Sequence, residues 1–265
     1  MPEDIAAGAG LGIIAVFNQK GGVGKTTTSV NLAAALARRG RLPYGIDLDP
    51  QAHFSNISGL QANGGDDTLL ALFQRNRPLR ELLLKTPSGL ELIPAHMELA
   101  KVDSLFGKGY NVVNRLNTAL KAERFLDEGR PVLIDCSPLI GVLSLNAIFA
   151  CQGVIIPVSA DHLSAKAALQ VDKSLRALET VLKHKVPRRF LLTRYDARRK
   201  MAAEIFQSLS ERFGEDVCQT RIAENVSLAE SPAHNQSVFD YAPNSRGAHD
   251  YDALVNELTE TGFLV

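Results

Sequence analysis

A glycine-rich segment at residues 18–27, with the sequence NQKGGVGKTT, constrains the fold of this chain more than any other feature. An apolar run at residues 13–17 leads directly into it, and apolar or small residues at helical spacing follow it between Val30 and Ala37. The glycines allow positive φ angles and let successive backbone N–H groups approach an anion. A strand, a glycine loop and a helix in this order therefore predict a loop that presents a phosphate to a helix N-terminus.

The side chains of this loop have expected roles at such a phosphate. We expect the Lys25 ammonium to meet the β- and γ-phosphates of a nucleotide and the Thr26 hydroxyl to be available to Mg²⁺. The general pattern GxxxxGK[ST] has glycine where this chain has Gln19, and Lys20 is an additional lysine. An ordinary glycine-rich turn with a surface lysine is the alternative interpretation. The predicted nucleotide-binding residues are Lys20, Gly21, Gly22, Val23, Gly24, Lys25, Thr26 and Thr27.

Two further segments carry acidic residues at the ends of expected strands. Asp47 and Asp49 stand at alternate positions, which predicts that they point to the same side. Because α/β sheets bind ligands at the carboxyl ends of their strands, both are candidates for positioning Mg²⁺ and water; an Asp–Pro turn that caps a helix is the alternative. The run at residues 131–135 ends in Asp135 and is typical of a strand buried on both faces. The predicted metal-binding residues are Thr26, Asp49 and Asp135.

The composition favours a single α/β domain over residues 1–265, with a short N-terminal extension at residues 1–10. Lys plus Arg and Asp plus Glu number 29 each, so any affinity for nucleic acid must come from a local patch. The three cysteines are too few and too scattered for a disulfide framework, and they suit a reducing cytoplasm. We interpret His53 and His96 as surface or capping residues. No signal peptide or membrane-length apolar run is found, so a cytoplasmic location is expected.

One local patch of positive charge is present. Residues 183–200 contain eight Lys or Arg and a single acid, Asp196. Basic side chains that neutralise phosphates release counterions, and this release supplies most of the affinity of non-specific DNA binding. A solvated charged face is the alternative and more common explanation. The candidate DNA contacts are Arg188, Arg189, Arg198, Arg199 and Lys200.

The segment NQKGGVGKTT resembles the deviant Walker A loop of the ParA/Soj branch of the ParA/MinD ATPases. Later segments resemble other motifs of that family in the same order. They are DLDPQ at residues 47–51, DCSP at 135–138, TRYDARRK at 193–200, IAENVSLAESPAH at 222–234 and SRGA at 245–248. The guanine-specific pattern Asn-Lys-x-Asp is not found near residues 190–196, which favours an adenine nucleotide.

The resemblance implies a doubly wound, mostly parallel β-sheet with helices on both faces, as in P-loop NTPases of the deviant Walker A type. It implies ATP and Mg²⁺ as ligands and an ATP-dependent sandwich homodimer. In that dimer Lys20 would cross to the phosphates of the partner copy, much as an arginine finger supplies a charge in trans. The second aspartate of the 47–51 motif, Asp49, is implicated in hydrolysis, and Asp135 matches the Walker B type acid. The residues implied to be catalytic are Lys20, Lys25, Asp49 and Asp135.

The resemblance also implies a cellular role. The ATP-bound dimer would bind double-stranded DNA non-specifically, on the nucleoid, and a ParB-like or cargo-adaptor protein would stimulate a slow hydrolysis that releases it. The cargo would be a chromosome or plasmid partition complex, or a protein cluster. Arg198 falls on a DNA-contacting arginine of the family, whereas Glu224 and Ser227 replace two family arginines and Ser137 replaces a proline. The replacements shift the expectation towards a non-standard cargo.

Three other functions are consistent with parts of the sequence. A membrane-surface organiser like MinD would need a basic C-terminal helix, and the helix expected at about residues 245–260 is acidic, so no membrane contact is expected. An electron-transfer ATPase like the nitrogenase iron protein would need a cysteine pair at a cluster, and Cys136 stands without one. An ATP-dependent binding module with little turnover is the third alternative.

Overall fold

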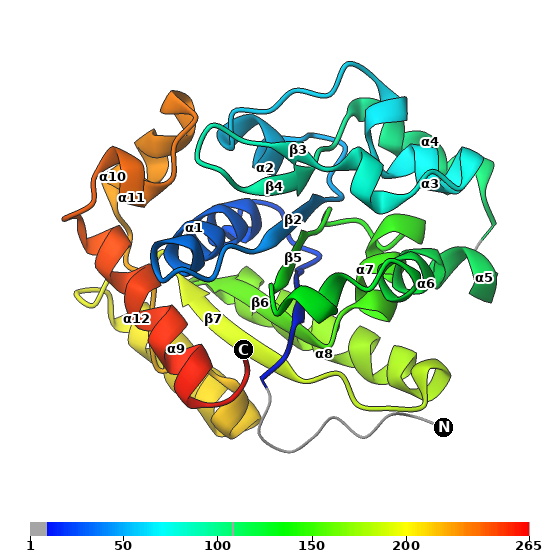
Figure 1. Cartoon of the computed structure of the whole chain (residues 1–265). Coiled ribbons are helices and arrows are strands. Elements are labelled where there is room, and N and C mark those ends of the chain that lie inside the picture. The colour runs from blue at the N-terminus through cyan, green and yellow to red at the C-terminus, as the bar shows by residue number, and fades with distance from the viewer. Residues whose placement is uncertain (1–9, 108, 265) are drawn as a thin grey trace.

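The computed structural model describes residues 10–107 and 109–264, and within them seven strands form one sheet (Figure 1). The strand order is β3-β4-β2-β5-β1-β6-β7, and every neighbouring pair is parallel except β3 and β4. The mostly parallel, doubly wound sheet expected from the sequence is therefore confirmed. The strands are β1 (Ile13–Val16), β2 (Tyr44–Asp47), β3 (Leu84–Lys85), β4 (Glu91–Ile93), β5 (Val132–Asp135), β6 (Gly153–Ser159) and β7 (Arg188–Thr193).

Helices cover both faces of the sheet (Figure 1). One core lies under α3, α4, α6, α7, α8 and α9, and the other lies under α1, α2, α10, α11 and α12. The helices are α1 (Lys25–Arg38), α2 (His53–Ile57), α3 (Leu69–Arg75), α4 (Lys101–Leu105), α5 (Tyr110–Val113), α6 (Arg115–Ala122), α7 (Val142–Ala150), α8 (His162–Leu182), α9 (Lys200–Phe213), α10 (Val226–Glu230), α11 (Val238–Tyr241) and α12 (Arg246–Glu260). The 3₁₀ segments are η1 (Gly65–Asp67), η2 (Leu79–Leu82), η3 (Met97–Ala100), η4 (Phe125–Glu128), η5 (Gly214–Asp216) and η6 (Ser231–His234).

The two cores follow from the alternation of side chains along each strand. In β1, Ile13 and Ala15 belong to the core under α7 and α8, whereas Ile14 and Val16 belong to the core under α1 and α12. Successive side chains of a strand point to opposite faces, so a strand covered on both sides must be apolar at every position. The unbroken apolar runs in the sequence are therefore the central strands of the sheet.

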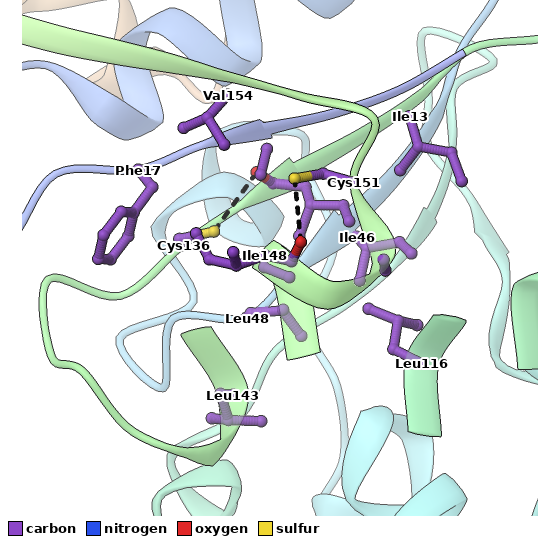
Figure 2. Packing of buried hydrophobic residues seen from close by; sticks show 14 of the residues in the cluster. Ile13, Phe17, Ile46, Leu48, Leu116, Cys136, Leu143, Ile148, Cys151 and Val154 are labelled. Atoms are coloured by element: carbon purple, nitrogen blue, oxygen red, sulfur yellow. Dashed lines mark hydrogen bonds between the residues drawn. The ribbon is translucent and has the colours of Figure 1, made fainter. Parts of the chain in front are cut away.

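Two cysteines help to fill the core under α7. Figure 2 shows Cys136 and Cys151 among aliphatic side chains, and the Cys151 thiol lies 3.5 Å from the Ile148 carbonyl oxygen. Burial raises the pKa of the Cys151 thiol to about 12. Both thiols are free and buried, and they behave as small apolar packing groups.

One short segment differs from its expected structure. The pattern at residues 79–85 predicts a short helix, but η2 is followed by β3, which pairs antiparallel with β4. The turn between them closes through Gly89, whose φ of 89° lies in the left-handed region that favours glycine. Residues 84–85 form a strand instead of continuing the helix, because the open edge of β4 supplies backbone hydrogen-bond partners for them. The local sequence pattern does not reveal these partners.

The C-terminal helix α12 is part of the folded domain. Its residues Tyr251, Leu254 and Leu258 are buried in the core shared with α1. The carboxylate of Asp250 accepts a hydrogen bond from the Ala223 N–H at 2.8 Å, and Asp252 pairs with Arg39. The apolar face of α12 is thus already packed against protein. Among the described helices, none combines the length and the apolar character that crossing a bilayer requires.

Candidate nucleotide site

The topology brings the loops after β1, β2, β5, β6 and β7 to one edge of the sheet. β1 lies between β5 and β6, and Asp47 at the end of β2 pairs in register with Asp135 at the end of β5. The glycine loop leaves β1 in the middle of this edge and leads into α1. The predicted acids and the predicted phosphate loop therefore meet, because parallel strands end on the same side.

The glycine loop has the open shape of an anion cradle. Gly22 and Gly24 have φ values of 73° and 88°, and Gly24 is the N-cap of α1. A Cβ built on Gly21 or Gly22 would meet no atom within 4 Å, so the backbone is bare on its outer side. The first N–H groups of α1 lack helical partners, and together with the helix dipole they favour a negative charge at this place.

Three contacts hold the loop in this shape. The Asn18 amide donates to the Pro157 carbonyl oxygen at 2.7 Å, and its Oδ1 accepts from the Lys20 N–H at 3.0 Å. The Thr193 hydroxyl donates to the Val23 carbonyl oxygen at 2.9 Å. The loop is therefore tied to β6 and to the end of β7. Sequence reasoning missed Asn18 and Thr193 as supports, although both lie within motifs that resemble those of the family.

Lys25 is the first residue of α1, directly after the glycines of the loop, and it is buried. Its Nζ donates to the carbonyl oxygen of Lys20 at 3.1 Å. Burial lowers the pKa of Lys25, and the nearby charges of Asp135 and Asp49 act against this lowering. The structure thus brings Lys25, Asp49 and Asp135 into one electrostatic neighbourhood, as the sequence predicted.

Asp135 is fully buried at the end of β5, and its carboxylate accepts hydrogen bonds from two hydroxyl groups of α1. Thr26 donates to its Oδ2 at 2.8 Å and Ser29 donates to its Oδ1 at 2.7 Å. Burial raises the pKa of Asp135, against the effect of these two hydrogen bonds. The predicted pair of metal-binding residues, Thr26 and Asp135, is therefore in contact. Ser29 was not predicted; its position one helical turn after Thr26 is the signal that could have revealed it.

The two aspartates at the end of β2 and just beyond it have separate environments. Asp47 is fully buried, and its Oδ2 accepts from the N–H and the hydroxyl of Ser55 at 2.8 and 2.7 Å. Burial, followed by the charge of Asp135, raises the pKa of Asp47. Asp49 is half-buried, lies beyond the end of the strand, and accepts from the Gln51 N–H at 3.0 Å. Asp47 therefore anchors α2, and Asp49 is the more open of the two carboxylates.

The additional lysine of the loop contacts α8. Its Nζ lies 2.8 Å from Asp161 Oδ1 and 2.7 Å from the Ser164 hydroxyl oxygen. Asp161 is also the N-cap of α8, because its Oδ1 accepts from the Ser164 N–H at 2.8 Å. The neighbouring Gln19 amide donates to the Ser174 hydroxyl at 3.0 Å. In the sequence, Asp161 and Ser164 have only the pattern of a helix cap, so their contact with Lys20 was not foreseen.

The basic segment does not form one continuous surface. Lys183 and Lys185 precede β7 and Arg198 follows it. The two lysines and Arg198 therefore lie at opposite ends of that strand. Arg188 is a correction to the predicted DNA contacts: its side chain is 9% exposed and pairs with Asp172 at 2.7 Å and with Glu179. A guanidinium enclosed by two carboxylates inside the protein cannot reach a phosphate backbone.

The other four candidates differ among themselves in exposure. Arg189 is 18% exposed, pairs with Asp216 at 3.3 Å and lies over the Phe263 ring. Arg198, Arg199 and Lys200 are 89%, 60% and 91% exposed at the carboxyl edge, beside the end of β7.

His96 caps η3 by accepting from the Glu98 N–H, which confirms its predicted capping role.

Comparisons with known proteins show to which family this chain is similar. A family model described as an AAA domain, AAA_31, matches residues 11–187. The chromosome-partitioning ATPase Soj of Thermus thermophilus is 39% identical over 92% of this chain and 94% of its own length. The chromosome partitioning protein ParA of Caulobacter vibrioides is 32% identical over 94% of both chains.

A solved structure shares the fold. Cobyrinic acid a,c-diamide synthase from Mycobacterium smegmatis, with bound ADP and magnesium, superposes with a TM-score of 0.78 at 26% identity over 94% of each chain. The sequence relatives are similar to this chain over almost its whole length. This chain belongs to the Soj/ParA family of chromosome-partitioning ATPases.

Proposed function

We propose that this chain, folded as one ATPase domain, hydrolyses ATP to ADP and phosphate with Mg²⁺ and uses the ATP-bound state to position a cargo. The observation that carries the proposal is the phosphate loop itself. Three features occur together there: an open glycine backbone, a buried lysine whose ammonium bonds to a carbonyl oxygen of the loop, and the hydrogen bond from Thr26 to Asp135. The similarity to chromosome-partitioning ATPases supports the same activity.

The residues at the loop fit a magnesium nucleotide. The backbone from Gly21 to Gly24 and the N-terminus of α1 would bind the phosphates, and Lys25 would exchange its bond to a carbonyl oxygen for a stronger one to phosphate. Thr26 and Asp135 offer the oxygen atoms that Mg²⁺ prefers. When bound, Mg²⁺ neutralises charge that develops on the phosphates. Asp49, open at the edge and near Lys25, would orient the attacking water.

We propose that the active form is a homodimer. Lys20 belongs to the loop, yet its ammonium is bonded to α8. In a dimer that shares its nucleotides, Lys20 would leave Asp161 and meet the phosphates of the partner copy as a point charge. Leu139 and Leu163, each 72% exposed, follow β5 and β6 on the two sides of the loop and supply apolar contact area.

The proposed partners are non-specific double-stranded DNA and a ParB-like or cargo-adaptor protein that stimulates hydrolysis. The support for DNA is the exposed basic edge, which we define as Arg198, Arg199 and Lys200. Counterion release from these residues would give salt-dependent binding without base recognition. The proposed location is the cytoplasm, with the ATP-bound form on the nucleoid and without a membrane contact.

Three measurements on one preparation test this function. Phosphate release is expected only with ATP and Mg²⁺. Light scattering is expected to give a dimer with ATP and a monomer with ADP. Fluorescence anisotropy with a random-sequence duplex is expected to show binding with ATP that weakens with ADP or without nucleotide. A chain that stays monomeric with saturating ATP and releases no phosphate would contradict the proposal, and equal DNA binding in all nucleotide states would remove its DNA part.

A further inference from the structure

Each cation of the basic edge has an acidic partner on the protein itself. Arg198 pairs with Asp196 at 2.9 Å, and Lys200 pairs with Glu204 one helical turn further along α9 at 3.4 Å. These partners are close neighbours in the sequence. Arg199 also pairs with Asp196, at 3.4 Å from its Nε, but it has a second acidic partner. Its Nη2 lies 3.3 Å from Oε2 of Glu224, which comes from a separate loop between η5 and α10.

The backbone holds Glu224 in this position. The Glu224 N–H donates to the Tyr195 carbonyl oxygen at 3.1 Å, and the Tyr195 N–H donates to the Ile222 carbonyl oxygen at 3.0 Å. The two hydrogen bonds join the Glu224 loop to the segment that follows β7, directly before α9. Main-chain hydrogen bonds that do not involve the Arg199 side chain therefore place the backbone of Glu224 beside the segment that leads into α9.

The ion pair lies at the surface. The side chains of Arg199 and Glu224 are 60% and 56% exposed. An exposed pair of this kind contributes little to stability, because water solvates both charges well. Its consequence lies in recognition: the carboxylate uses donors of the Arg199 guanidinium and places a negative charge where a phosphate would approach. Like charges that meet across an interface oppose binding.

We propose that Glu224 is a built-in restraint on the anion-binding surface of this protein, and that it lowers the affinity of the basic edge for the phosphate backbone of duplex DNA by competing for Arg199. The inference rests on the proposed DNA binding and adds the residue that sets its strength. Glu224 takes no part in the phosphate loop, so a substitution of Glu224 should change the affinity for DNA without changing the affinity for nucleotide. DNA must displace the carboxylate from Arg199 before a phosphate can use all the donors of the guanidinium.

Anisotropy titrations of a labelled random-sequence duplex, with ATP and Mg²⁺ at several salt concentrations, test this restraint. Glu224→Gln is expected to bind about three to ten times more tightly than the unmodified chain, and Glu224→Arg more tightly still. The slope of log Kd against log salt is expected to steepen by about 0.9 for each additional phosphate that the protein neutralises. The matched control is Glu215→Gln, an exposed acid on η5 at the far end of α9, which is expected to change neither quantity.

A double-mutant cycle assigns the effect to Arg199. The increase in affinity from Glu224→Gln is expected to be smaller in an Arg199→Ala background, because only the direct repulsion of the phosphate remains there. An increase of equal size in that background, or one that Glu215→Gln reproduces, would overturn the restraint. If the unmodified chain binds DNA and Glu224→Gln matches it, only this inference is wrong. If binding appears in Glu224→Arg alone, the added cation and not the release of Arg199 produces it, and the restraint is wrong. If no variant binds at low salt, the DNA part of the proposed function is wrong, and the restraint with it.

Discussion

Lys20 Nζ lies 2.8 Å from Asp161 Oδ1, so the additional lysine of the phosphate loop is bonded to the first turn of α8. Both side chains are partly exposed, at 30% and 40%. Lys25 is likewise bonded within the chain, to a carbonyl oxygen of the same loop. Each ammonium group is therefore bonded within the chain, and a phosphate that binds to either lysine would have to replace one of these bonds.

We expect Asp161→Asn to form the ATP-dependent dimer at an ATP concentration about two to five times lower than the unmodified chain requires. Asparagine remains a good N-cap for α8 but lacks the charge that holds Lys20. Light scattering across an ATP titration measures the midpoint, with Asp127→Asn on η4 as the control. A higher midpoint for Asp161→Asn would show that Asp161 stabilises the dimer instead, through the partner's lysine.

The same ion pair predicts a pH dependence of stability. Although burial acts in the opposite direction, the hydrogen bonds from Lys20 and Ser164 lower the pKa of Asp161 below its usual value. A carboxyl with a lowered folded-state pKa contributes stability above the unfolded pKa of about 4, and this contribution is lost as the pH falls through the folded value. Thermal unfolding of the unmodified chain and of Asp161→Asn should therefore differ by a constant amount well above the unfolded pKa, and the two should converge as the pH falls below the lowered folded-state pKa. A difference that grows towards low pH would contradict the assignment.

We expect Lys25→Ala to weaken ATP binding by about 10- to 100-fold, because a buried ammonium that bonds phosphate contributes about 1.5–3 kcal/mol. Equilibrium titration with a fluorescent ATP analogue measures the affinity. Lys173→Ala removes an exposed lysine from α8 and serves as the control. Unchanged affinity in Lys25→Ala would mean that the loop does not hold the phosphates as described.

Asp49→Ala is expected to lower the rate of ATP hydrolysis by at least about 100-fold, the usual effect of losing a group that assists proton transfer or orients water. ATP-dependent dimerisation should persist, because Asp49 lies outside the glycine backbone. Phosphate release and light scattering on the same sample separate the two properties. Hydrolysis at the unmodified rate would refute the role given to Asp49.

Arg188→Ala is expected to destabilise the fold by about 3 kcal/mol, since it removes the buried cation between Asp172 and the half-buried Glu179 and leaves Asp172 only the exposed Arg176. Urea unfolding measures the loss. Arg198→Ala is the contrasting variant: its side chain is 89% exposed, so it should keep its stability and lose DNA affinity. If Arg188→Ala unfolds like the unmodified chain while its DNA affinity falls, the correction made for Arg188 is wrong.

Local pattern was sufficient for the architecture and for the centre of the site. The strand before the glycine loop, the helix after it and the buried run that ends in Asp135 are continuous in the sequence. Parallel strands end on one side, so their order along the chain already placed Asp49 and Asp135 near Lys25. The strands and helices could be predicted because each depends on residues that are neighbours within a single element, whereas the meeting of the acids with Lys25 follows from the common direction of the parallel strands.

Most contacts between elements had no such signal. Spacing shows which way a side chain points from its own helix or strand, but not which segment packs against it. Lys20 with Asp161, Ser29 with Asp135, and Arg199 with Glu224 each join residues from separate elements. In the same way, β7 divides one run of basic residues into a buried Arg188 and an exposed Arg198. Amino-acid pattern determined the fold and the phosphate loop, whereas packing decided which charges are paired, buried or open to a ligand.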